Sequence, residues 1–167
     1  MRELQKLKEK EKAAPAAPEV KYVDAVPPFS TPLQIVKYPA PCLRAENVGL
    51  KAFGDDLALL AKEMFSVMYA TDGIGLAAPQ VGVNVRMMVF NAEGVPGRGE
   101  EVVLVNPQIV QFGEKLDWYE EGCLSFPKLY ADVKRPLTCT VKAQDMGGED
   151  IELRLDGLEA RGFQHEY

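Results

Sequence analysis

The chain has 167 residues, of which 47% are hydrophobic, and it carries 25 acidic side chains, 19 basic side chains and 1 histidine. This length suits one domain with a substantial core, and a formal net charge of -6 argues against a basic face for phosphates, so direct DNA binding is not expected. A single histidine excludes any site that needs two histidines from these residues, and 3 cysteines favour a reducing compartment over a disulfide framework.

The N-terminal residues 1–31 are predicted to form a disordered tail. Lys and Glu dominate 2–12, and an Ala/Pro-rich stretch follows over 13–18. Neither part has an apolar stripe to bury. No apolar run approaches the roughly 18 residues of a membrane helix, so no membrane association is expected. The composition becomes that of a folded domain at Pro32, and this domain is predicted to span 32–167.

The first periodic element is predicted as an amphipathic helix from Asp55 to about Thr71. Apolar residues recur there at three- and four-residue steps, namely Leu57, Leu60, Met64 and Val67 or Met68. Acidic residues fill its first turn, where the helix dipole favours them. The helix ends before Gly73, because the following segment is too rich in Gly and Pro to continue it.

Short β-like runs with the spacing of antiparallel hairpins follow this helix. They cover 86–91, 102–106, 108–112, 137–144 and 151–155. The clearest reversals are the Gly-rich loop 92–100 and the Gly-Gly turn within 146–150. A last helix is predicted over 158–167 with Asp156 as its N-cap. Since no Gly or Pro terminates it, the helix and the domain are expected to be incomplete at Tyr167.

Three segments carry residue types that metal-assisted amide hydrolysis needs. In residues 73–80 the backbone is suited to approach a ligand closely, and Gln80 offers an amide donor to an oxyanion; the alternative is a tight turn before an edge strand. Cys123 is either a soft metal ligand or a small buried hydrophobe. His165 and Glu166 open an H-E-x-x-H pattern, in which the Glu is a general base, but alone they indicate only a surface pair. The other two cysteines, Cys42 and Cys139, are predicted to be structural.

The order, spacing and wording of these segments resemble peptide deformylases, the metal enzymes that remove the N-formyl group from nascent formyl-methionyl peptides. The family signature G-x-G-L-A-A-x-Q is complete at 73–80, and E-G-C-L-S is complete at 121–125. The signature Q-H-E-x-D-H is matched over 164–167, as far as its fourth position. The resemblance covers 32–167 and is greatest to the plant and algal organellar type.

The resemblance implies an α+β fold with antiparallel strands around a central metal-binding helix that bears His165. It implies one divalent metal ion, Fe2+ with Zn2+ or Ni2+ as substitutes, bound by Cys123 and His165. Glu166 would be the general base for the attacking water, and Gln80 and the backbone N–H of Leu124 would stabilise the oxyanion. The implied contacts with the peptide and its methionine side chain are Gly73, Ile74, Gly75, Tyr119, Glu121, Gly122 and Leu158. Arg135 matches the position that forms a supporting ion pair with Glu121.

N-formylmethionyl peptides and the ribosome near its exit tunnel are the implied partners. The implied location is a plastid or another organelle, and otherwise a bacterial cytoplasm. Because the second histidine of the third signature is absent, this chain is expected to bind metal weakly and to turn over formyl-peptides poorly. One alternative is therefore a catalytically impaired protein that binds formyl-peptides or the ribosome. Another is a cysteine hydrolase with Cys123 as nucleophile and His165 as base, which chelators would spare.

Overall fold

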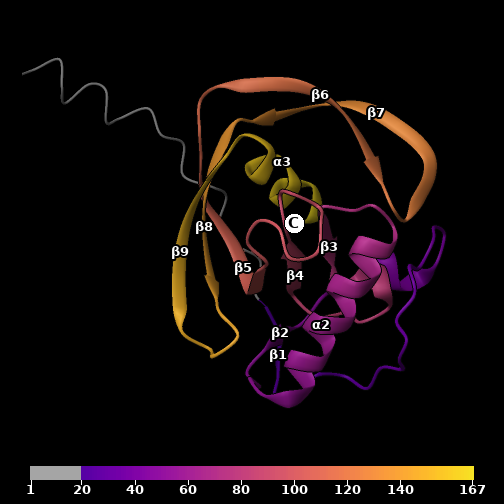
Figure 1. Cartoon of the computed structure of the whole chain (residues 1–167). Coiled ribbons are helices and arrows are strands. Elements are labelled where there is room, and N and C mark those ends of the chain that lie inside the picture. The colour runs from indigo at the N-terminus through magenta and orange to yellow at the C-terminus, as the bar shows by residue number, and fades with distance from the viewer. Residues whose placement is uncertain (1–19) are drawn as a thin grey trace, which may run out of the picture.

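The computed structural model describes residues 20–167, and the part of the predicted tail over 1–19 lies outside them. The described residues form an α+β fold in which helices pack on both faces of a 5-stranded sheet of order β3-β4-β5-β8-β9 (Figure 1). All neighbouring strands of this sheet are antiparallel. The predicted fold class is therefore confirmed. Within the described part of the chain, no helix is long and apolar enough to cross a membrane.

The α-helices of the described residues are α2 (Asp55–Ala70) and α3 (Gly157–Glu166), and the short 3-10 helices are η1 (Pro41–Arg44) and η2 (Ala78–Val81). The main sheet contains β3 (Gly75–Ala77), β4 (Met87–Phe90), β5 (Val102–Phe112), β8 (Thr138–Gln144) and β9 (Asp150–Asp156). A separate hairpin consists of β6 (Leu116–Cys123) and β7 (Phe126–Pro136). A short parallel pair consists of β1 (Tyr22–Val23) and β2 (Gly49–Leu50).

Both predicted helices are confirmed, and the predicted strands all lie in the main sheet. The runs over 102–106 and 108–112 are one strand, β5, whose register against β8 shifts between Val105 and Gln108. Asp156 occupies the N-cap position of α3, but its side chain makes no capping hydrogen bond. The β6–β7 hairpin was not predicted, because most of its side chains are exposed and leave no burial pattern.

The domain begins earlier than the predicted boundary at Pro32. Tyr22 and Val23 pair with Gly49 and Leu50, and Val26 belongs to the buried core. Residues 20–31 are thus part of the folded domain and not of a disordered tail. This earlier start of the domain could not be predicted from the sequence, because a two-residue parallel pairing produces no periodic pattern.

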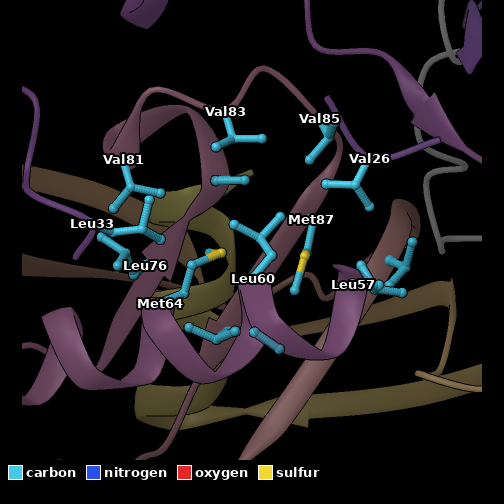
Figure 2. Packing of buried hydrophobic residues seen from close by; sticks show 14 of the residues in the cluster. Val26, Leu33, Leu57, Leu60, Met64, Leu76, Val81, Val83, Val85 and Met87 are labelled. Atoms are coloured by element: carbon cyan, nitrogen blue, oxygen red, sulfur yellow. The ribbon is translucent and has the colours of Figure 1, made fainter. Parts of the chain in front are cut away.

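The core has two halves, one on each face of the main sheet. Along β4, Met87 and Val89 pack into the cluster with α2, whereas Met88 and Phe90 pack into the cluster with Phe163 of α3. This alternation is the period of a strand that is buried on both faces. Figure 2 shows the α2 half, to which this helix contributes Leu57, Leu60, Met64 and Met68. Each such buried side chain stabilises the fold by about 1.5–3 kcal/mol.

Asn106 joins three strands at the irregular point of β5. Its backbone is left-handed, with a φ of 51°, a conformation that Asn tolerates better than most residues. Its Oδ1 accepts a hydrogen bond from the N–H of Leu50 at 2.8 Å, and its Nδ2 donates to the carbonyl of Leu50 and to Oε1 of Gln144, both at 2.7 Å. One side chain therefore ties β2 and β8 to β5.

Substitution Asn106→Ala is expected to lower the free energy of unfolding by about 3 kcal/mol. It removes three partly buried hydrogen bonds of about 1 kcal/mol each, and a left-handed backbone suits Ala less well than Asn. Urea denaturation measures the change. Gln108→Ala, at an exposed position of the same strand, is the control and should change stability by less than about 0.5 kcal/mol. Equal midpoints for the two variants would contradict the role of Asn106.

Candidate active site

A cavity of about 650 Å³ lies between the β3 segment, the β6–β7 hairpin and α3. Every site residue predicted from the sequence lines it except Gln80, which is buried behind it. The predicted residues on its wall are Gly73, Ile74, Gly75, Tyr119, Glu121, Gly122, Cys123, Leu124, Leu158, His165 and Glu166. The fold therefore brings the three sequence segments together around one concave site.

The possible metal ligands Cys123 and His165 meet at one end of this cavity. Cys123 ends β6, His165 lies in the last turn of α3, and both side chains line the cavity. His165 Nδ1 lies 2.9 Å from Oε2 of Glu121, an interaction that leaves Nε2 for a metal. The contact with Cys123 raises the pKa of His165, burial opposes this effect and the bond to Glu121 adds to it, giving a pKa of about 9. Metal binding at this pair would therefore release a proton.

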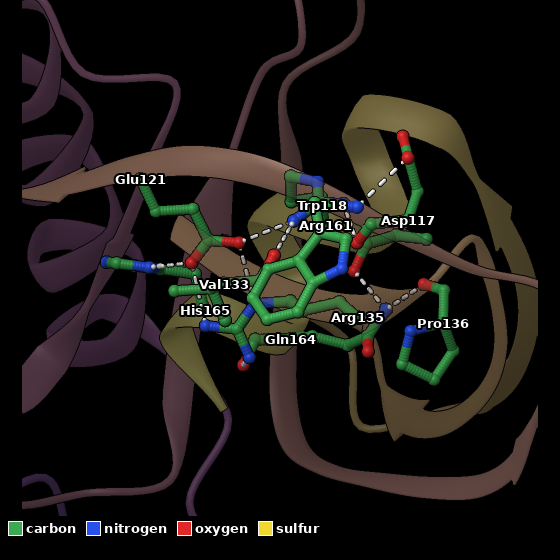
Figure 3. A network of polar contacts seen from close by, with 10 residues as sticks. Asp117, Trp118, Glu121, Val133, Arg135, Pro136, Arg161, Gln164 and His165 are labelled. Carbon is green, nitrogen blue, oxygen red and sulfur yellow. Dashed lines mark hydrogen bonds and ion pairs between the residues drawn. The ribbon is translucent and has the colours of Figure 1, made fainter. Parts of the chain in front are cut away.

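Glu121 is the centre of a charged network that orients His165 (Figure 3). Its side chain is only 7% exposed. Arg135 donates to both carboxylate oxygens, from Nε at 2.7 Å and from Nη2 at 2.8 Å, and Arg161 donates from Nη1 at 2.9 Å. Burial alone raises the pKa of Glu121, but the bonds from Arg135, His165 and Arg161 outweigh it and lower the pKa to about 2. The carboxylate is thus ionised and accepts the proton of His165 Nδ1.

Arg161 was missed by the sequence reasoning, although a signal for it exists. It precedes His165 by four residues on α3, so helical spacing places both on one face. Besides Glu121 it donates to the carbonyls of Val133 at 3.2 Å and Asp117 at 3.0 Å. Arg161 therefore fastens α3 to both strands of the hairpin.

The backbone N–H of Ala77 is hydrogen-bonded to both side chains that are predicted to be catalytic, Gln80 and Glu166. The N–H of Ala77 donates to Oε1 of Gln80 at 2.7 Å and to Oε2 of Glu166 at 3.1 Å. With its Oε1 fixed in this way, Gln80 directs Nε2 to Sγ of Cys123, at 3.6 Å. Burial raises the pKa of Glu166 to about 7, against the opposing charge of His165 and the bond from Ala77. The arrangement presents an amide donor and a carboxylate base side by side.

A thiol and an imidazole that converge in this way are suitable ligands for a divalent transition metal. Glu121 orients the imidazole through its hydrogen bond with Nδ1 of His165. It thus completes the carboxylate–histidine arrangement typical of such sites. Residues 20–167 contain no cluster of 3 or more His, Cys, Asp or Glu side chains able to hold a metal ion. Cys123 and His165 thus fit a metal as two ligands of a set that generally has three.

Residues 32–167 match the family model for polypeptide deformylases. The chain belongs to the peptide deformylase family. It is 58% identical over 139 residues to peptide deformylase 1B, chloroplastic, from Oryza sativa subsp. japonica, covering 83% of this chain and 52% of that protein. It is 41% identical to a peptide deformylase from Erythrobacter litoralis, covering 80% of this chain and 81% of that protein. The chain spans about half the length of the plant relatives that it matches.

Solved peptide deformylase structures have the same fold. The Arabidopsis thaliana peptide deformylase 1B in complex with an inhibitor has a TM-score of 0.79 at 53% identity, over 81% of this chain and 75% of that one. The Thermotoga maritima enzyme has a TM-score of 0.74 at 37% identity, over 80% of this chain and 88% of that one. The family and fold predicted from the three signatures are thereby confirmed.

Proposed function

We propose that this chain is a metal-dependent hydrolase that removes the N-formyl group from N-formylmethionyl peptides. The observation that carries the proposal is the convergence of Cys123, His165, Gln80 and Glu166 from three separate elements, β6, α3 and η2, beside the cavity. These side chains supply a soft metal site, an oxyanion donor and a base.

Each side chain has one task in the proposed hydrolysis. Oε2 of Glu166 is tied to Ala77, so Oε1 takes the proton of the attacking water. Nε2 of Gln80, together with the backbone N–H of Leu124, donates to the formyl oxygen as it becomes negative. A divalent metal held by Cys123 and His165 would supply Lewis-acid activation of the water and of the formyl group. We infer Fe2+ as the native ion, with Zn2+ or Ni2+ as substitutes.

The peptide is proposed to extend along β3, an edge strand of the main sheet. Its backbone would pair with the Gly73–Gly75 segment by strand addition. The methionine side chain would enter the cavity between Ile74, Tyr119 and Leu158, which all line it. Gly122 and Tyr130 also line the cavity, and a Cβ at Gly122 would lie 2.9 Å from the ring of Tyr130, so a larger residue there would displace this ring.

The similarity to plant relatives named as chloroplastic supports a plastid as the proposed location. Proteins are initiated there with formyl-methionine, so the substrates would be nascent chains. A position at the ribosomal exit tunnel is part of this proposal.

An Asp-His dipeptide added after Tyr167 is expected to raise metal affinity by roughly 100-fold or more. The N–H of Tyr167 donates to the carbonyl of Phe163 at 2.9 Å, so the helix can continue and a histidine four positions after His165 would share its face. Loss of a single outer hydrogen-bond partner typically costs about 10–100-fold in metal affinity, and a direct ligand should exceed this. Competition titration with Ni2+ measures the change, and an Asp-Ala extension is the control.

The same proteins test the proposed function. The metal-loaded Asp-His chain should release formate from formyl-Met-Ala-Ser, and a chelator should abolish the reaction. Peptide binding without formate release would indicate a binding module instead. Formate release that survives complete metal removal would indicate a cysteine hydrolase. Equal metal affinity for the two extensions would contradict the assignment of Cys123 and His165 as ligands.

A further inference from the structure

Asn91 is a buried polar residue outside the cavity, and the proposed mechanism gives it no role. It follows the last residue of β4 and is 1% exposed. Its Nδ2 donates to Oη of Tyr69 at 2.9 Å and to the carbonyl of Arg98 at 2.7 Å, and its Oδ1 accepts from the N–H of Glu93 at 3.0 Å. A buried amide with this many partners fixes its surroundings in one arrangement.

These bonds fix the loop 92–101 between β4 and β5. Two of the partners, Glu93 and Arg98, belong to the loop itself. Because the loop is mostly exposed and buries few side chains, its hydrogen bonds to the Asn91 side chain hold it in place. The third partner, Tyr69, lies on α2 and donates its hydroxyl proton to Glu101 at 2.7 Å. Both ends of the loop are thereby attached to the same helix.

The loop in turn supports Ile74 on the cavity wall. The backbone N–H of Asn91 donates to the carbonyl of Ile74 at 2.9 Å, which continues the β3–β4 pairing beyond Gly75 and Phe90. A Cβ at Gly94 would lie 3.1 Å from Cγ2 of Ile74, so the loop backbone and this side chain are already in close contact. Asn91 thus holds Ile74 both directly and through the loop.

We propose that Asn91 is a positioning residue for substrate binding, which it supports by holding loop 92–101 against Ile74. This inference rests on the proposed function, in which the Gly73–Gly75 segment binds the formyl-peptide. Asn91 acts through Ile74, because it does not line the cavity. Its effect should therefore fall on peptide binding, since the network does not include Gln80, Cys123 or Glu166.

Hydrogen exchange of the 167-residue chain tests this role without turnover. Asn91→Ala is expected to speed exchange over 73–75 and 92–101 by about tenfold relative to the rest of the main sheet, because it removes hydrogen bonds that close the loop. Tyr69→Phe, a milder variant that keeps the ring in the core, should change the same segments in the same direction. Arg98→Ala, which removes an exposed side chain from the same loop, should change neither.

Kinetics of the metal-loaded chain extended by Asp-His provide a second readout. Asn91→Ala and Tyr69→Phe should raise KM for formyl-Met-Ala-Ser by about fivefold or more, with kcat within about twofold of the parent. Uniformly faster exchange with unchanged KM would overturn the proposal, because it would show a merely structural role. Unchanged exchange over 73–75 in both folded variants would overturn it as well. If the parent releases no formate, the proposed function fails, whereas the exchange comparison still decides whether Asn91 holds the 73–75 segment.

Discussion

Substitution Glu121→Ala is expected to lower the free energy of unfolding by about 3–5 kcal/mol, which is the usual cost of removing one partner from a buried ion network. Glu121 accepts hydrogen bonds from Arg135, Arg161 and His165. The Arg161 side chain is only 9% exposed, so the variant leaves a nearly buried guanidinium without its charged partner. Urea denaturation of the variant and its parent measures the difference.

The neighbouring substitution Glu120→Ala is the control for this prediction. Glu120 is exposed and lies outside the hydrogen-bond network of Glu121, so its removal should change stability by less than about 0.5 kcal/mol. Glu121→Ala should also weaken metal binding by about 10–100-fold, because His165 loses the carboxylate that orients it. A Glu121→Ala protein as stable as the Glu120→Ala protein would show that the network does not hold α3 to the hairpin.

Local patterns were enough to predict the helices and most of the main sheet. In α2 the apolar spacing identified Leu57, Leu60 and Met64 on the buried face. The structure decides for Met68 over Val67 and adds Ala61 and Phe65. The continuous apolar run of β4 fits a strand between two layers. Such patterns are visible in sequence because burial on a regular element repeats with the period of that element.

The β6–β7 hairpin and the N-terminal strand were not predicted, for one shared physical reason. Neither buries a regular apolar face of its own: the hairpin is held by Arg161 and Glu121, and β1 by backbone pairing with β2. Contacts of this kind join residues far apart in the chain and leave no local period. The hairpin also carries Cys123 at its end, so its position decides where the site forms.

The sequence predicted residues that meet around one cavity, and of the side chains that support them it predicted only Arg135, which forms the expected ion pair with Glu121. The cavity contains all the predicted residues except Gln80, which reaches Cys123 from behind. The shared N–H of Ala77 and the side chains of Arg161 and Asn91 were not predicted, although the spacing of Arg161 from His165 on α3 was a signal for the first of these side chains. A backbone donor has no sequence signature, and a buried Asn or Arg reveals its role only through its partners.

Substitution Glu166→Gln is expected to reduce kcat for formyl-Met-Ala-Ser by about 10²–10⁴-fold in the metal-loaded chain extended by Asp-His, the usual contribution of a general base. Gln has the same shape and can still accept the N–H of Ala77 through one oxygen, so metal affinity and fold should change little. The amide accepts no proton from the attacking water at neutral pH, so the loss should appear in kcat.

Glu159→Gln makes the same chemical change on the same helix, at an exposed position outside the cavity. It should retain the parent's kcat, which separates an effect of the base from an effect of charge on α3.

The sharpest comparison is the ratio of kcat to bound metal in the two variants, because a Glu166→Gln protein that lost metal would lose activity for another reason. If Glu166→Gln kept its metal and its kcat stayed within about threefold of the Glu159→Gln value, another group would have to take the proton. The remaining candidates on the cavity wall, Asp72 and Glu120, lack the hydrogen bond from Ala77 that orients Glu166 toward Gln80 and Cys123.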